Sequence, residues 1–300
     1  MYRTFVILRH TFKEAAVQPI YSLLIAIGAA ILLIFGQLPF FTLGEDTVMF
    51  KAVGLDIILL LVLIATLFAT SKSIFEEIED RTMLTLMSKP VQKWEVLVGK
   101  YLGIIAAALL AVVILGIVFA VATWIRVPED YMLRTRSIHD ADIRRLRDTR
   151  LVHLMGLAPS LLLAWLQVSV LAAIGVALST RFSLVVNLPA VILLYIAGNL
   201  ARFLPPVRNP DTGDTNPLLA VVWAASQVLP FLQIFDLREH TVYGLIRVPG
   251  TIFAQTGTVS LGTVWGYVGI ALLYAIAFST FALAAGLISF GRRELGGAEG

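Results

Sequence analysis

Acidic side chains gather in one short stretch of the chain. Four carboxylates lie close together there: Glu76, Glu77, Glu79 and Asp80. Arg81 follows them, and residues 82–87 form a compact run with helical character. Pro90 ends this run, because proline disfavours helix in the residue before it. A short charged helix between two apolar blocks is suited to docking into the groove of a partner protein, and the alternative is an ordinary solvated loop.

The motifs of several enzyme classes are absent from the chain. A phosphate-binding loop needs G-x-x-x-x-G-K-[ST] between a strand and a helix. The nearest fragment, Val98-Gly99-Lys100-Tyr101, lacks the upstream glycine, the hydroxyl residue and the strand. H-E-x-x-H and G-x-S-x-G do not occur, and the absence of cysteine excludes disulfides, thiol catalysis and Cys-ligated metals. We therefore expect no catalytic residue, metal or cofactor on this chain.

The composition is that of an integral membrane protein. Of the 300 residues, 58% are hydrophobic and 14% are charged, whereas a soluble domain carries about a quarter charged residues. The mean hydropathy is +0.87. The apolar residues come in blocks of about twenty, each long enough to cross roughly 30 Å of hydrocarbon. Basic residues in such a chain usually meet lipid headgroups, so the net charge of +3 does not indicate a nucleic-acid partner.

The apolar blocks predict an all-α integral membrane fold with six transmembrane helices. These spans cover about residues 20–35, 53–71, 101–124, 157–179, 184–203 and 264–290. Residues 1–19 place Phe5, Leu8 and Phe12 on one face, which is typical of a helix lying in the membrane interface. The alternative for this segment is a solvated start of the first span.

Three longer connections separate the spans. Residues 72–100 are polar and contain the acidic cluster. Residues 126–156 carry seven arginines and contact either an anionic substrate or partner, or the anionic headgroups of the membrane surface. Residues 204–260 include an apolar piece, 218–236, that Gln227 and Pro230 interrupt. We favour a re-entrant or interfacial segment there over a crossing helix.

Ionisable residues are rare within the predicted spans. A charge near the bilayer centre costs about 2.5–3.5 kcal/mol on insertion scales, so carriers driven by protons keep such groups for function. Asp56 lies in the first turn of the second span, where the helix N-terminus stabilises it, and Arg202 snorkels near the end of the fifth. The histidines lie in non-spanning segments, where we interpret them as surface residues: His10, His139, His153 and His240.

The charge distribution leaves the orientation open. With six spans, 11 Arg and Lys residues lie on the side of both termini and 12 on the other, so the positive-inside rule does not decide between the two orientations. The flanks of the first span favour a cytoplasmic N-terminus, whereas the arginines of 126–156 oppose it.

The sequence from Ser71 to Gly103 resembles the cytoplasmic coupling segment of ABC-2 type transporter permeases. It reads SKSIFEEIEDRTMLTLMSKPVQKWEVLVGKYLG, and the usual pattern in that family is close to E-x-E-x-G-T-x-x-x-L-L-x-x-P-V. The residues that match are Glu77, Glu79, Thr82, Leu86, Pro90 and Val91. Arg81 stands where the family usually has glycine. The likeness extends to the N-terminal interfacial helix, the six spans and the FGRREL run near the end.

The resemblance implies a single ABC-2 type transmembrane domain over residues 1–300. Such a permease works as a homodimer or heterodimer with two separate ATPase subunits, which hold ATP and magnesium, and itself catalyses nothing. It lies in the cytoplasmic membrane with both termini in the cytoplasm. The residues expected to couple it to the ATPase are Glu76, Glu77, Glu79, Asp80, Arg81, Thr82, Leu86, Lys89 and Pro90. The expected interface anchors are Trp94, Lys100, Arg292 and Arg293.

The sequence does not identify a cargo. A lipid, a glycan precursor, a small toxic molecule and a peptide all remain open, as does a role in maturing an extracytoplasmic metalloenzyme. Two other classes of function compete with an export permease: a non-transporting membrane scaffold or sensor, and an ion-coupled carrier. The nearly charge-free spans disfavour the carrier.

Overall fold

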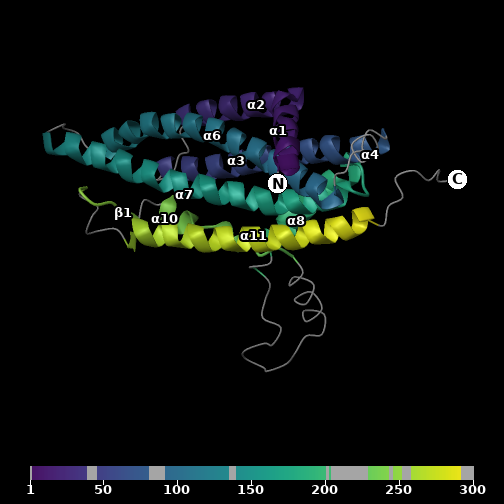
Figure 1. Cartoon of the computed structure of the whole chain (residues 1–300). Helices are drawn as coiled ribbons and strands as arrows, with labels where there is room; N and C mark the ends of the chain where they lie inside the picture. Colours follow the sequence, from purple (N-terminus) through teal and green to yellow (C-terminus); the bar gives the residue numbers. More distant parts are fainter. Residues whose placement is uncertain are drawn as a thin grey trace, which may run out of the picture.

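A computed structural model describes residues 2–38, 46–80, 92–134, 140–200, 203, 229–242, 246–251 and 258–291. For 128–134 and 140–142 it describes the helical backbone without the side chains. The described residues are almost entirely helical, and the long helices run side by side in one bundle (Figure 1). The two ends of this bundle differ in chemistry. We call the end that holds residues 71–80 the acidic end, and the other the opposite end.

In the part of the chain that the structure describes, five helices are long and apolar enough to cross a membrane. They are α2 (Pro19–Gln37), α3 with its continuation (Asp46–Glu79), α6 (Lys93–Arg134), α7 (Asp140–Ser179) and α11 (Leu261–Gly291). They confirm an all-α membrane protein. The fifth predicted span corresponds to α8 (Leu184–Leu200), whose 17 residues extend about 26 Å. That length is slightly below the thickness of a typical hydrocarbon core, so the count of six spans stays a prediction.

The second predicted span starts earlier than the sequence indicated. The helix α3 (Asp46–Thr70) begins seven residues before the predicted position 53. Asp56 therefore lies nearly three turns inside the helix, and its predicted place in the first turn is wrong. Lys51 and Asp56 lower the local hydropathy, which is why the apolar pattern alone placed the boundary too late.

The arginine-rich connection between the third and fourth spans is a continuation of two helices. The helices α6 and α7 have 42 and 40 residues, so each is about 60 Å long, roughly twice the hydrocarbon thickness. Ile143 and Leu146 of this connection both belong to α7. Figure 1 shows the two helices extending together at the opposite end of the bundle.

The N-terminal helix α1 (Tyr2–Val17) lies across the bundle and packs on α6 (Figure 1). Gly99 and Gly103 of α6 make this close crossing possible. A Cβ atom added at Gly103 would lie 2.7 Å from the carbonyl oxygen of Leu8, and one at Gly99 would lie 3.0 Å from that of Thr4. Glycines four residues apart let two helix backbones approach each other closely, as is common in membrane bundles.

Short elements connect α8 to α11 at the opposite end. They are the 3₁₀ turn η3 (Leu232–Phe235), the single turn α10 (Arg238–Thr241), and strand β1 (Ile246–Arg247), which pairs in parallel with β2 (Val259–Ser260). The backbone N–H of Phe231 donates to the Tyr274 hydroxyl at 2.7 Å, about 20 Å along α11 from its first residue. The described part of the predicted re-entrant piece thus lies against the bundle in short turns, and residues 218–228 lie outside the described residues.

The core lies where α3, α6 and α7 meet. Phe50 of α3 contacts Phe119 of α6 with 5.2 Å between ring centroids, and Phe119 also covers Gly54, where a Cβ would approach its ring to 2.3 Å. A Cβ atom added at Gly175 of α7 would likewise lie only 2.9 Å from the Leu67 side chain of α3. This interlocked packing makes α3 the central helix that connects the two ends of the bundle.

Candidate functional site at the acidic end

A π-helix joins α3 to the acidic cluster. The segment η1 (Ser71–Glu76) follows α3 without a break, and α4 (Glu77–Glu79) continues it to Asp80. Ser71, Ser73 and Ile74 are buried, so this wide turn belongs to the bundle. Such π-turns within α-helices are rare and are frequent at functional sites. Here α4 and Asp80 separate the π-helix from residues 81–91.

Lys100 of α6 holds the π-helix from the side. Its Nζ donates to the backbone carbonyl of Ser73, to the Ser73 Oγ at 3.1 Å and to Glu77 Oε2 at 2.7 Å. The lysine side chain is only 4% exposed. The predicted role of Lys100 as an anchor snorkelling to the interface is therefore wrong. Its charge is stabilised inside the bundle, because a buried ammonium group needs both an ion-pair partner and hydrogen-bond acceptors.

The four carboxylates of the cluster separate into two groups. Glu77 faces inward to Lys100, whereas Glu76, Glu79 and Asp80 are exposed. Their helical spacing explains the split, because successive residues point about 100° apart around the axis. The exposed group, which we call the acidic face, comprises Glu76, Glu79 and Asp80. The sequence alone does not distinguish these four carboxylates. The ion pair with Lys100 separates Glu77 from the other three.

The first turn of α6 returns the chain to the bundle beside this cluster. Glu95 Oε2 accepts the backbone N–H of Gln92 at 3.0 Å, which is half of a capping box at the helix start. The indole N–H of Trp94 donates to the Gln92 side chain, and Trp94 is exposed at the acidic end. Lys93 lies over the Phe290 ring at 5.4 Å and so links the start of α6 to the end of α11.

Several predicted site residues lie outside the described part of the chain. In the coupling segment these are Arg81, Thr82, Leu86, Lys89 and Pro90, and near the C-terminus they are Arg292 and Arg293. The structure therefore describes the positions of Glu76, Glu77, Glu79, Asp80, Trp94 and Lys100. It brings Glu77 and Lys100 together.

A second buried lysine lies at the opposite end. Lys51 of α3 has no exposed surface, and its Nζ contacts His153 Nδ1 at 2.9 Å and donates to the Thr241 carbonyl at 3.0 Å. The sequence analysis interpreted His153 as a surface residue, but its ring contacts the buried Lys51. The Thr241 hydroxyl also hydrogen-bonds to Ser160 at 2.8 Å. These contacts attach α10 to both α3 and α7.

Arg238 makes the second attachment of α10. It forms an ion pair with Asp56 at 2.5 Å and approaches Asp236 at 3.8 Å. Burial disfavours the charged guanidinium, but the hydrogen bond and charge of Asp56 outweigh it and raise the Arg238 pKa above its ordinary value. Asp56 is thus satisfied by an arginine from 182 residues away and not by a helix N-terminus. We call the described residues 229–242 the α10 segment.

Arg126 caps the end of α2 from inside the bundle. Its guanidinium donates to the carbonyl oxygens of Phe35, Gly36 and Leu38 at 3.2, 2.8 and 2.8 Å. The last carbonyls of a helix have no partner within the helix, so this arginine satisfies acceptors that would otherwise be unpaired. Together with Lys51 and Lys100, it shows that the bundle contains more buried charge than the sequence indicated.

Comparison with known families decides the wider class. The model of the ABC-2 family transporter proteins matches residues 13–295, which is nearly the whole chain. The chain belongs to the ABC-2 transporter family. No curated protein matches it at a significant level.

For an ABC-2 family protein, an ABC ATPase is the partner that membership implies in general. The match includes the acidic face, the π-helix and the residues between them and α6. Residues 71–103, which resemble the coupling segment of ABC-2 permeases, thus lie in the matched region. In the described part of this region, Lys100 and Glu77 make the ion pair that joins α6 to the turn before residues 81–91.

Proposed function

We propose that this chain is the permease subunit of an ATP-driven exporter in the cytoplasmic membrane. It would act as a dimer with a second copy or a paralogue, and a separate ABC ATPase would hydrolyse the nucleotide. The observation that carries the proposal is the contact of Lys100 with Ser73 and Glu77, directly beside the acidic face. This contact gives an ATPase docked there a mechanical connection to two long helices.

The acidic face supplies the docking chemistry. Glu76, Glu79 and Asp80 are exposed and carry no part of the core, so an electropositive groove on an ATPase can engage them without disturbing the bundle. Complementary charges chiefly set specificity and the rate of association. We place Arg81, Thr82, Leu86, Lys89 and Pro90 in the same docking segment, and Trp94, Arg292 and Arg293 at the neighbouring membrane surface.

Movement of the docking segment would pass into the bundle through η1. A displacement of the acidic face moves η1, which is continuous with α3, and Lys100 transmits the same displacement to α6. Because the helices interlock, as at Gly54 and Phe119, α3 moves as a rod and does not bend locally. The displacement then reaches Lys51 and Asp56 near the opposite end.

The α10 segment would be the element that responds at the opposite end. Two contacts join it to α3: Lys51 with the Thr241 carbonyl, and Asp56 with Arg238. A conformational change requires contacts that differ between the two states. We infer that these two contacts are made in the closed state and broken when the permease opens outward.

A second candidate function is an ion-coupled carrier. The contact between Lys51 and His153 favours it, because two ionisable side chains meet within the bundle, where the sequence indicated almost none. In the described contacts this pair includes no carboxylate, so it lacks the acidic member that proton relays in membrane carriers commonly use. A non-transporting scaffold or sensor is the third candidate.

Co-purification tests the proposal most directly. The tagged chain, extracted in mild detergent from its native membranes, should bring down an ATPase with a Walker motif.

Reporter fusions after Ser88 and Glu294 should report cytoplasm, and a fusion at Asp140 should report the other side of the membrane. Transport that continues without any ATPase but follows a proton gradient would support the carrier. If neither an ATPase nor transport is found, the non-transporting scaffold or sensor is the remaining candidate.

A further inference from the structure

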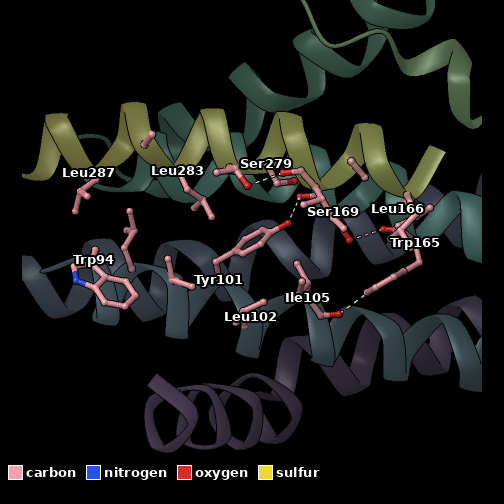
Figure 2. Close-up of a pocket in the computed structure, with 17 residues that line it drawn as sticks. Trp94, Tyr101, Leu102, Ile105, Trp165, Leu166, Ser169, Ser279, Leu283 and Leu287 are labelled. Carbon is pink, nitrogen blue, oxygen red and sulfur yellow. Dashed lines mark hydrogen bonds between the residues drawn. The ribbon is translucent and has the colours of Figure 1, made fainter. Parts of the chain in front are cut away.

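A cavity of about 410 Å³ lies between α6, α7 and α11. Its wall is almost entirely apolar, with Trp94 and Trp165 among the lining residues. Figure 2 shows Tyr101 projecting from α6 toward α11, with Ser169 and Ser279 close to its hydroxyl group. The cavity lies in the half of the bundle near the acidic end, because Trp94 belongs to the first turn of α6.

Most polar groups around the cavity are already paired. The Tyr101 hydroxyl donates to the Ser169 carbonyl at 3.2 Å, and the Trp165 indole N–H donates to the Ile105 carbonyl at 2.9 Å (Figure 2). The Ser169 hydroxyl donates back to the Trp165 carbonyl at 2.8 Å. These bonds fix the wall in one arrangement.

The Ser279 hydroxyl is the exception. The residue is 4% exposed, lines the cavity, and its Oγ has no hydrogen-bond partner among the described residues. It lies near enough to the Tyr101 hydroxyl to interact with it, but without the geometry of a hydrogen bond. A serine in a helix usually bonds to the carbonyl four residues earlier. Leaving a buried hydroxyl unpaired is costly, so this group calls for a ligand.

The cavity opens toward an exposed apolar surface of the bundle, which we take to face the hydrocarbon. Ile276 and Leu272 of α11 line it and are 56% and 41% exposed, and Trp94 at one end is also exposed. From Trp94 to Ile105 it follows α6 for about 16 Å. Ser279 lies midway along the α11 stretch that lines it. A molecule entering from the hydrocarbon would therefore meet apolar walls on both sides of one hydroxyl donor.

We propose that this cavity binds an elongated, mainly apolar molecule dissolved in the membrane that carries a hydrogen-bond-accepting oxygen near its middle. The Ser279 hydroxyl donates to that oxygen. A bare hydrocarbon chain would fill the apolar walls but would leave the donor unpaired, so the site discriminates in favour of a ketone or similar group. As a cargo class for the permease this rests on the proposed function, whereas binding itself requires no ATPase.

A dialkylbenzophenone is a suitable probe, because it is apolar at both ends and has a central carbonyl. The purified full chain in phosphatidylethanolamine–phosphatidylglycerol nanodiscs is mixed with the probe and irradiated. The excited carbonyl takes a hydrogen atom from a nearby C–H bond, and the two carbon radicals join. We expect adducts on α6, α7 and α11 around Ser279, located by mass spectrometry of peptides. A non-photoreactive dialkyl ketone should compete better than the matching alkane.

Two variants of α11 form a matched pair. Ala284 lines the cavity, whereas the adjacent Ala285 is exposed and does not line it. Ala284→Trp should abolish the localised adducts, and Ala285→Trp should retain them. Ser279→Ala should weaken competition by the ketone about three- to ten-fold, with no change for the alkane. Each variant must first elute as a single species with a Tm no lower than that of the unsubstituted chain.

Adducts spread evenly over the lipid-facing helices, or adducts that persist in Ala284→Trp, would overturn the proposal. Equal competition by ketone and alkane would contradict the role of Ser279. Because the experiment contains no ATPase, its failure leaves the permease role intact. In turn, failure of co-purification with an ATPase leaves the binding result intact.

Discussion

Buried cations are the residues that connect distant parts of this bundle. Lys100 and Lys51 each bind a backbone carbonyl of another element, at Ser73 and Thr241 respectively, and Arg126 binds three carbonyls at the end of α2. A carbonyl that has lost its helical partner is a good acceptor, and a long basic side chain can reach it from a neighbouring helix. In this protein such contacts join elements at both ends.

Replacing Lys100 tests the contact at the acidic end. Lys100→Met keeps the length and volume of the side chain but leaves Glu77 and the Ser73 carbonyl without their partner. We expect a loss of about 1–3 kcal/mol in the free energy of unfolding, measured by thermal denaturation in detergent. ATP hydrolysis by the complex should also become independent of cargo.

Lys93→Met is the control for this variant. Lys93 is seven residues earlier on α6 and contacts only the face of the Phe290 ring among the interactions described for it. Its replacement should cost less than about 1 kcal/mol and leave coupling intact. Equal effects of the two substitutions would remove the special role of Lys100.

Replacing Lys51 tests the attachment of the α10 segment. Lys51→Met removes the donor to the Thr241 carbonyl while preserving an apolar contact in the core. The chain has no native cysteine, so a single Val242→Cys, at a position 2% exposed, reports on this segment alone. We expect maleimide labelling of that cysteine to become several-fold faster in the Lys51→Met background. Lys72→Met, in η1 at the acidic end, should leave the rate unchanged.

At the scale of elements, the crossing of α1 over α6 depends on two glycines. Gly103→Ala would place a methyl group 2.7 Å from the backbone oxygen of Leu8, and a backbone atom cannot turn away as a flexible side chain can. We expect a destabilisation of about 1–3 kcal/mol, seen as a lower Tm in detergent. Gly269→Ala, where nothing lies within 4 Å, should be neutral or stabilising by up to about 1 kcal/mol. A neutral Gly103→Ala would mean that α1 does not pack here.

The sequence predicted the elements better than their contacts. Blocks of apolar residues located the long helices, because burying twenty apolar residues in a bilayer needs no knowledge of neighbours. The partners of Lys51 lie 102 and 190 residues away, so no local pattern reveals them. The split between Glu77 and the exposed Glu79 depends on where Lys100 points. The predicted second span began at about residue 53, which left Lys51 outside it. A predicted start at Asp46 would have placed Lys51 inside the helix and indicated its burial.

At the scale of the whole molecule, the proposed assembly with an ATPase can be tested by changing the acidic face. Reversing two charges of the acidic face with Glu79→Lys and Asp80→Lys should weaken co-purification of the ATPase at least ten-fold. A single exposed ion pair contributes only about 0–1 kcal/mol, which is why two are changed together. Desolvated pairs at an interface contribute about 2–5 kcal/mol. Insertion and folding should not change, because both side chains are exposed.

Arg144→Glu with Arg145→Glu is the matched control for assembly. These arginines are exposed on α7, in the helical extension at the opposite end, and their reversal should leave the ATPase bound. Normal assembly and transport in the acidic-face variant would contradict the docking assignment and would mean that another surface binds the ATPase.

The π-helix also bears on the rotational phase of the residues beyond it. Its turn contains more residues than an α-helical turn, so deleting Lys72 would let the remaining five residues wind as ordinary α-helix and leave everything beyond them in nearly the same orientation. Glu77 would then still face Lys100, and the acidic face would keep its direction on an otherwise unchanged bundle. We expect this deletion variant to keep both its helical circular dichroism spectrum and its ATPase. The π-helix would thus absorb one residue without turning the surface that the permease presents to its ATPase.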